Sequence, residues 1–367
     1  MAMHTQYLTA HHLEFTLEAL TPVSLNEHQG SALRGALYHG LRAFCAQRER
    51  TTCAGCLVLG VCPVAALVST LDPEGVRGQD LPRPYVLEPP LDGRTRLAPG
   101  ERLTFGLTLL GAALPLFPYV VQALRRLEEI GLGKGTAGGR RGRVRLVEAW
   151  AANPLSGERQ PVLHAGETTV QMPDVPVTAK QVQAVATHWP RARLALQFLT
   201  PTRLVAEGRL VRRPEFGVLF HRLWQRLADL SDSRSLSGGL AAERRPLDVL
   251  RAGSAPSEEA LVGAGRRSAE GFQSPISNRP EPADRYHLVG LARQVRLVED
   301  ATRWVELESY STRQSRSTPI GGFVGRATYE GDLEPFLPWL VWGQVLHVGK
   351  DAVKGNGWYR VEAAPCT

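Results

Sequence analysis

Lysine is scarce in this chain. Only four of its 43 basic residues are lysine, so arginine carries nearly all of the positive charge behind a formal net charge of +7. Arginine is the side chain that suits two-pronged contacts with phosphate, and a basic protein attracts polyanions. Nucleic acid is therefore the first class of partner to consider, although a basic surface can also serve solubility alone.

The chain also lacks long apolar runs. No stretch reaches the roughly 18 consecutive apolar residues that a helix needs to span a bilayer, and Met1 is not followed by the basic and then apolar pattern of a signal peptide. We therefore expect a cytoplasmic protein with no membrane partner. Its 367 residues exceed the size of one ordinary hydrophobic core, so two domains are expected.

A strand pattern occurs twice. In residues 11–22, Leu13, Phe15 and Leu17 alternate with polar residues, as in a strand that is half buried. Residues 192–201 repeat the alternation, and both stretches end in the dipeptide Thr-Pro. The repetition indicates that two similar units follow one another along the chain.

Each of these strands is followed by a helical pattern. Residues 32–44 contain the phrase Leu-Tyr-His-Gly-Leu, and residues 216–227 contain Leu-Phe-His-Arg-Leu. In both copies a glycine-rich loop with basic residues then leads into a last strand, at 131–148 and at 349–362. Both of these stretches end in Val-Glu, which extends the repeat over the whole chain.

This order of elements predicts an α+β fold of tandem ferredoxin-like (RRM-like) domains, each a β-α-β-β-α-β unit. We place the first domain at residues 1–188 and the second at 189–367. Residues 231–285 are rich in Ser, Gly, Pro and Arg, and we interpret them as an irregular or partly disordered insertion in the second domain. The other expected elements are strands at 85–90, 103–110 and 322–329 and helices at 120–130 and 286–299.

The first of the two helices has a distinct core face. Leu33, Leu37, Leu41 and Phe44 follow one another at spacings of four, four and three residues, which places them on one side. At about 100° per residue, His39 lies roughly 200° from Leu37. His39 is therefore predicted to face away from the core.

His39 has neighbours that suit cleavage of RNA by transesterification. In that reaction a base takes the proton of the 2′-hydroxyl, an acid protonates the departing 5′-oxygen, and cations stabilise the charge on the phosphorus oxygens. We assign the acid–base role to His39, with Tyr38 and Arg42 as helpers. His221 holds the corresponding position in the second helix and is the alternative, and a histidine that is only solvated is the simpler interpretation.

Four of the five cysteines lie close together in the sequence, as Cys45-x7-Cys53-x2-Cys56-x5-Cys62. A cytoplasmic chain keeps its thiols reduced, and four thiolates with a Cys-x-x-Cys turn suit tetrahedral zinc. An iron–sulfur cluster and the absence of any metal stay open as alternatives. Four thiolate ligands leave no position for a catalytic water, so the predicted zinc is structural and there is no catalytic metal.

Both glycine-rich loops carry positive charge. Glycine lets a backbone adopt positive φ and approach a ligand closely. Lys350 and Lys354 lie among glycines 349, 355 and 357, which makes this loop a candidate phosphate cradle, although a tight turn between strands is the simpler interpretation. In the first copy, the basic residues interleaved with glycine are Lys134, Arg140, Arg141, Arg143 and Arg145.

The chain resembles a known family in several blocks. The first half contains Leu33-Arg34-Gly35-Ala36, His39, Leu41-Arg42, the cysteine group and Pro82-Arg-Pro-Tyr85-Val-Leu-Glu88-Pro-Pro. The second half contains Trp304, Tyr310-Ser311-Thr-Arg313-Gln314, Gly321-Gly322-Phe-Val-Gly325, Tyr329-Glu-Gly331-Asp-Leu and His347-Val-Gly-Lys350 followed by Gly355-Asn-Gly357-Trp-Tyr. Over most of its length, except residues 205–285, it is similar to the CRISPR-associated endoribonucleases of the RAMP superfamily, which process precursor CRISPR RNA.

The resemblance implies tandem ferredoxin-like domains and metal-independent cleavage of CRISPR repeat RNA to products with 2′,3′-cyclic phosphate and 5′-hydroxyl ends. Family members usually place a catalytic histidine in or near the first helix, which corresponds to His39, with His28 in the preceding loop as a further candidate. The implied partners are CRISPR repeat RNA and other CRISPR effector subunits. The residues assigned to RNA binding are Arg34, Lys134, Arg140, Arg141, Arg143, Arg313, Lys350 and Lys354.

Two other functions stay open at this stage. Some relatives bind RNA without cutting it, so the main alternative is a non-catalytic RAMP subunit that holds guide RNA in an effector complex. A zinc-dependent nuclease is disfavoured, because the sequence lacks a mixed His/Asp cluster with an open coordination position.

Overall fold

The structure is a computed structural model that describes residues 7–45, 53, 56–58, 62–69, 83–135, 139–231, 282–311 and 316–364. The irregular insertion predicted at 231–285 lies almost entirely outside the described residues, and so does Arg313. No helix in the described part of the chain has both the length and the apolar character needed to cross a bilayer.

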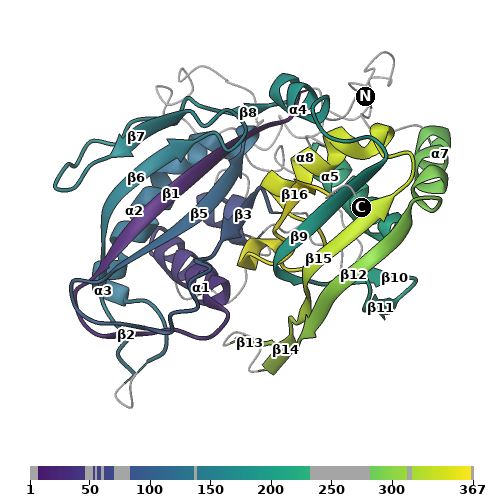
Figure 1. Cartoon of the computed structure of the whole chain (residues 1–367). Helices are drawn as coiled ribbons and strands as arrows, with labels where there is room; N and C mark the ends of the chain where they lie inside the picture. The colour runs from purple at the N-terminus through teal and green to yellow at the C-terminus, as the bar shows by residue number, and fades with distance from the viewer. Residues whose placement is uncertain are drawn as a thin grey trace, which may run out of the picture.

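The first half of the chain is built on an antiparallel sheet (Figure 1). Its strands lie in the order β3 (Tyr85–Glu88), β5 (Arg102–Leu110), β1 (Thr9–Ala19), β6 (Val144–Ala152) and β7 (Arg159–Leu163), and β8 (Val177–Thr178) pairs with the start of β1. Three helices share the apolar core of this half: α1 (Gln29–Arg42), α2 (Phe117–Arg125) and the short α3 (Leu127–Ile130). Two short strands, β2 (Val23–Ser24) and β4 (Arg96–Leu97), pair at one end.

The second half is built on a four-stranded antiparallel sheet. Its strands lie in the order β12 (Arg296–Val305), β15 (Gly322–Glu330), β9 (Arg193–Thr202) and β16 (Tyr359–Ala363). The helices of this half are α4 (Ala179–Ala186), α5 (Phe216–Ser231), α7 (Pro282–Ala292) and α8 (Leu337–Leu346). Two hairpins complete it, β10 (Leu204–Ala206) with β11 (Arg209–Val211) and β13 (Glu308–Ser311) with β14 (Arg316–Pro319).

The two sheets share one strand order. In the first sheet, four neighbouring strands lie in the spatial order β3, β5, β1, β6, and in the second sheet the order is β12, β15, β9, β16. Counted along the chain within each half, both orders are second, third, first, fourth. In each half a helix follows the first strand and another precedes the fourth, as the sequence repeat predicts. The mixed α+β class with antiparallel sheets is confirmed.

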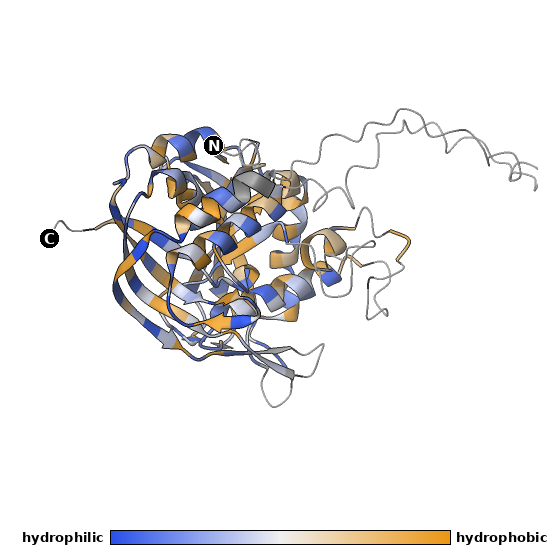
Figure 2. Ribbon diagram, turned by 90° about the vertical axis from the view of Figure 1, so that its right-hand side faces the viewer, coloured by the Kyte–Doolittle hydropathy of each residue, from blue (hydrophilic) through white to orange (hydrophobic). Residues whose placement is uncertain are grey.

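The alternation of apolar and polar residues explains why these segments form strands. On β1, Leu13, Phe15 and Leu17 are almost fully buried against the helices, whereas Glu14 and Glu18 lie on the other face and are half-buried. Figure 2 shows the same alternation as orange and blue segments along the strands. A period of two places one apolar face of the sheet against the helices.

Three local predictions are wrong. The helix expected at 120–130 is divided into α2 and α3 at Arg126. The helix expected at 286–299 ends at Ala292, and β12 begins at Arg296. Strand β12 lies at the edge of its sheet, and its residues are largely exposed on both faces. Its sequence therefore does not alternate between apolar and polar residues, which is the pattern that indicates a strand. Phe44, expected in the core, follows the end of α1 and is 39% exposed, with its ring packed on Tyr119.

The two halves share apolar contacts. Helix α4 lies before the predicted boundary at 188/189, but its Val182 and Ala186 belong to the core of the second half. Ala10 and Leu110, from the first sheet, join the same core. The halves are therefore packed against each other through α4 and the ends of β1 and β5.

Candidate functional site

The N-terminus of α1 is anchored by His28. Its Nδ1 accepts a hydrogen bond from the backbone N–H of Ser31 at 3.2 Å, which caps the helix. The hydrogen of the ring is therefore on Nε2, which donates to Oδ1 of Asn356 at 2.6 Å. Burial lowers the pKa of His28, and the bond to Asn356 only partly offsets this. Both ring nitrogens are occupied within the protein, so His28 is not placed to exchange a proton with a substrate.

The glycine loop of the second half packs on this same helix. A side chain at Gly30 would collide with the carbonyl of Lys354, and one at Gly355 would collide with Pro89. Asn356 is fully buried, and Lys354 forms an ion pair with Asp351 at 2.9 Å. Much of the predicted phosphate cradle therefore forms the contact between the two halves, and Lys350 is its exposed cation.

His39 lies farther along α1, on the side away from the core. Leu33, Leu37 and Leu41 are buried as predicted, whereas His39 is half-buried. The ring of Tyr38 meets the imidazole edge to face, with 5.5 Å between centroids. Burial, and to a smaller extent the charge of Arg141, lowers the pKa of His39 below its usual 6.5. The imidazole is therefore mainly neutral at pH 7, as a general base must be.

Arg141 reaches this site from the glycine loop of the first half. Leu132 and Gly142 pair across the loop, and the backbone N–H of Lys134 donates to the carbonyl of Ser24 at 2.7 Å. A side chain at Gly142 would collide with the backbone carbonyl of Pro22. These contacts fix the loop against the segment that contains β2, and they place Arg141 close enough for its charge to act on His39.

The other predicted basic residues are divided between surface and interior. Lys134, Arg140 and Arg143 are exposed on the same loop as Arg141. Arg34 instead is half-buried near Tyr85 of β3, where burial raises the pKa of the Tyr85 hydroxyl and the charge of Arg34 opposes that rise. Its environment differs from that of the exposed arginines.

The two remaining residues on the predicted helices have different surroundings. Arg42, at the end of α1, donates from Nη1 to the sulfur of Cys45 at 3.5 Å. His221 is half-buried on α5 in the second half. The structure thus places Tyr38 against His39, with the charge of Arg141 acting on the pKa of His39, and leaves His221 in a different half of the chain.

The four cysteines of the predicted zinc site are partly exposed and form no disulfide. Among the residues that the structure describes, these four included, no three histidine, cysteine, aspartate or glutamate side chains gather as a group that could hold a metal ion. Cys62 instead packs against the core of the first half. The structure does not test the predicted zinc site, which stays a prediction.

Sequence reasoning missed a buried polar cluster between the halves. Glu88 of β3 lies 3.5 Å from Nδ1 of His12 on β1 and 3.9 Å from Nε2 of His347, which follows α8. His347 is fully buried, and burial lowers its pKa although Glu88 opposes this. Burial raises the pKa of Glu88, but its interactions with His12, His347 and Arg360 outweigh burial and hold that pKa below its usual value. Residues so far apart in sequence gave no local signal of this contact.

Comparison with known proteins gives matches to families and to structures. No curated protein matches the chain. Residues 8–175 match a family model described as an N-terminal domain, and residues 196–359 match the model of the CRISPR-associated endoribonuclease Cas6.

Solved structures are similar in fold over nearly the whole chain. A Cas6 product complex has a TM-score of 0.52 at 14% identity, covering 96% of this chain and 99% of that chain. Thermus thermophilus Cas6 has a TM-score of 0.51 at 13% identity, covering 96% and 98%. A partial Cas6-RT-Cas1–Cas2 complex has a TM-score of 0.52 at 12% identity, covering 99% of this chain and 48% of that chain.

These findings agree with the blocks of residues that first indicated the family. The Cas6 model matches the half of the chain that holds most of those blocks, and the fold of both halves is that of solved Cas6 structures. The resemblance is confirmed: residues 196–359 match the Cas6 endoribonuclease model, and the chain has the fold of solved Cas6 structures.

Proposed function

We propose that this protein is an endoribonuclease that cleaves CRISPR precursor RNA within the repeat. The observation that carries the proposal is the cluster on α1, where a half-buried, neutral histidine lies beside a tyrosine and within the field of an arginine. The match of residues 196–359 to the Cas6 endoribonuclease model supports it. A product complex among the similar structures supports the same class of reaction.

The reaction that suits this cluster is internal transesterification. Neutral His39 takes the proton of the 2′-hydroxyl, and the 2′-oxygen then bonds to the adjacent phosphorus. The bond from phosphorus to the 5′-oxygen breaks, and that oxygen receives a proton, for which the hydroxyl of Tyr38 is the candidate donor. Arg141 and Arg42 are the candidate cations for the charge on the phosphorane oxygens. The products have a 2′,3′-cyclic phosphate and a 5′-hydroxyl, and no step requires a metal ion.

The two halves are proposed to be tandem ferredoxin-like domains. Their shared strand order, with a helix after the first strand and another before the fourth, is that of a β-α-β-β-α-β unit. In this arrangement the RNA contacts the exposed cations of the first glycine loop near His39 and Lys350 of the second. Association with other CRISPR proteins is part of the proposal, supported by the likeness to the partial Cas6-RT-Cas1–Cas2 complex.

Cleavage of repeat RNA in EDTA tests the proposal. Purified protein in excess over end-labelled repeat RNA should give one cut per repeat, and the upstream fragment should carry a cyclic phosphate that resists phosphatase until acid opens it. RNA that is bound but left intact would instead favour the non-catalytic subunit. Cleavage that occurs only after a divalent ion is added would contradict the metal-independent mechanism.

A further inference from the structure

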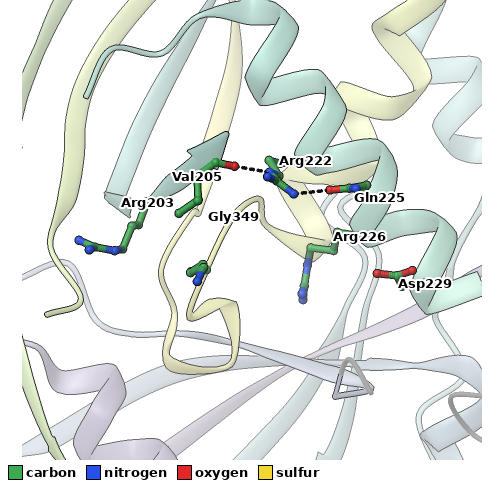
Figure 3. Close-up of a pocket in the computed structure, with 8 residues that line it drawn as sticks. Arg203, Val205, Arg222, Gln225, Arg226, Asp229 and Gly349 are labelled. Carbon is green, nitrogen blue, oxygen red and sulfur yellow. Dashed lines mark hydrogen bonds between the residues drawn. The ribbon is translucent and has the colours of Figure 1, made fainter. Parts of the chain in front are cut away.

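The second half contains a basic pocket that the proposed chemistry does not use. Its cavity of about 400 Å³ lies between α5, the start of β10 and the first residues of the second glycine loop. Figure 3 shows Arg222 and Arg226 on the helix side, with Arg203 and Gly349 opposite them. Lys350 adds a fourth cation, and Asp229 is the acidic residue of the lining.

Arg226 is the most unusual of these side chains. Its Nε donates to the carbonyl of Leu346 at 2.8 Å, but its Nη2 is buried without a hydrogen-bond partner. Burial lowers the pKa of Arg226 to about 10, and the nearby charge of Asp229 only partly opposes this. A buried guanidinium hydrogen without an acceptor is costly, and an anion at this point would remove that cost.

The other arginines are held in place by neutral groups. Arg222 donates from Nε to the carbonyl of Val205 at 2.5 Å and from Nη1 to Oε1 of Gln225 at 2.6 Å. Arg203 donates from Nη1 to the carbonyl of Gly321 at 3.2 Å. Within the described part of the chain, these three arginines donate to carbonyl and amide oxygens and not to carboxylates. Neutral groups thus fix their positions, and the lining has four cations against the one carboxylate of Asp229, so the pocket keeps the net positive charge that an anion site requires.

We propose that this pocket binds a phosphate group of the RNA backbone, so that the RNA contacts α5 in addition to the site on α1. The inference rests on the proposed function. Planar guanidinium groups match phosphate oxygens in two-pronged contacts, and Gly349 leaves the floor of the pocket free of a side chain. The lining residues include no histidine, and Asp229 is their one carboxylate, so we assign the pocket to binding of the strand and not to cleavage.

The test measures RNA affinity against salt concentration. Arg222→Gln and Arg226→Gln, singly, should each weaken binding of repeat RNA by about tenfold, as expected when a charge-assisted hydrogen bond is removed. The logarithmic salt slope should become shallower by about 0.7 for each phosphate of a single strand that the variant no longer binds. Arg191→Gln is the matched control, because Arg191 is an exposed arginine paired with Glu334 at 3.0 Å, and it should change neither quantity.

Two further arms keep the outcomes distinct. Lys350→Ala removes an exposed side chain and should also make the salt slope shallower. Because this variant should fold, it tests the pocket even if an Arg226 variant does not fold. If the wild-type protein binds repeat RNA and the pocket variants bind it with an unchanged slope, the pocket proposal is wrong while the proposed function stands. Inorganic phosphate offers a second comparison. If it raises the melting temperature of the wild-type protein but not of the arginine variants, and these variants bind RNA as tightly as the wild type, the pocket binds free phosphate and the proposal is also wrong. If the wild-type protein does not bind repeat RNA, the proposed function and the pocket proposal fail together.

Discussion

The contact between His28 and Asn356 predicts a large loss of stability when Asn356 is replaced by alanine. Asn356 is fully buried and makes two hydrogen bonds. It accepts from Nε2 of His28, in the first half, at 2.6 Å, and it donates to the carbonyl of Ile320, in its own half, at 2.8 Å. Asn356→Ala removes both and leaves a buried donor and a buried acceptor without partners. Each such group costs roughly 1–3 kcal/mol, so the free energy of unfolding should fall by about 2–6 kcal/mol.

Chemical denaturation of a double-mutant cycle measures this effect. His28→Ala alone should cost about the same, because it also removes the cap of α1. The double variant should lose about 1–2 kcal/mol less unfolding free energy than the sum of the losses in the two single variants, because either substitution alone already breaks the hydrogen bond between His28 and Asn356. Gln183→Ala, on the exposed side of α4, is the control and should change little.

The same variants decide whether His28 is catalytic. At a temperature where every variant is folded, His28→Ala should retain cleavage per folded molecule, because both nitrogens of the ring are already engaged in the native protein. A coupling energy near zero would refute the inferred contact between the halves. A folded His28→Ala protein that no longer cleaves RNA would refute the structural role and make His28 the catalytic histidine.

Three further predictions follow from the site. If the zinc site forms, purified protein should contain about one equivalent of zinc. The double variant Cys53→Ser/Cys56→Ser should then be clearly less stable, while the part of it that is folded should cleave RNA at nearly the wild-type rate. Metal-free protein of full stability would contradict this. Arg141→Gln should raise the pKa of His39 in an NMR titration, because the charge of Arg141 lowers it now, and an unchanged value would place the two groups apart. Stability should fall as the pH drops through about 6.5, since the unfolded state then binds protons that buried histidines exclude; His347→Gln should flatten this dependence, and an unchanged curve would show that His347 does not contribute.

The parts of the fold that could be predicted are those with a local signal. Alternation at Leu13, Phe15 and Leu17 indicated β1, and the repeated phrase around His39 and His221 indicated that α1 and α5 hold equivalent places. A helical period is enough to tell which side of α1 faces the core, so the orientation of His39 followed from spacing alone.

The contacts between distant segments could not be predicted in this way. The bond from His28 to Asn356 spans 328 positions, and nothing near either residue specifies the other. The glycines around Lys354 were interpreted as room for a ligand, but Gly355 is needed because Pro89 of the first half lies against it. Arg226 was missed because an arginine on a helix is usually solvated, and only the packed structure shows that its Nη2 is buried.

The most direct test of the central claim is the single-turnover cleavage rate of His39→Ala with protein in excess over repeat RNA. The account predicts that this variant folds and binds RNA like the wild type, since His39 lies off the core face, but cleaves about 10² to 10⁴ times more slowly, as loss of general acid or base assistance implies. His221→Ala, at the equivalent position on α5, should cleave at the wild-type rate. Normal cleavage by His39→Ala, with activity lost in His221→Ala, would contradict the account and place the active site in the second half.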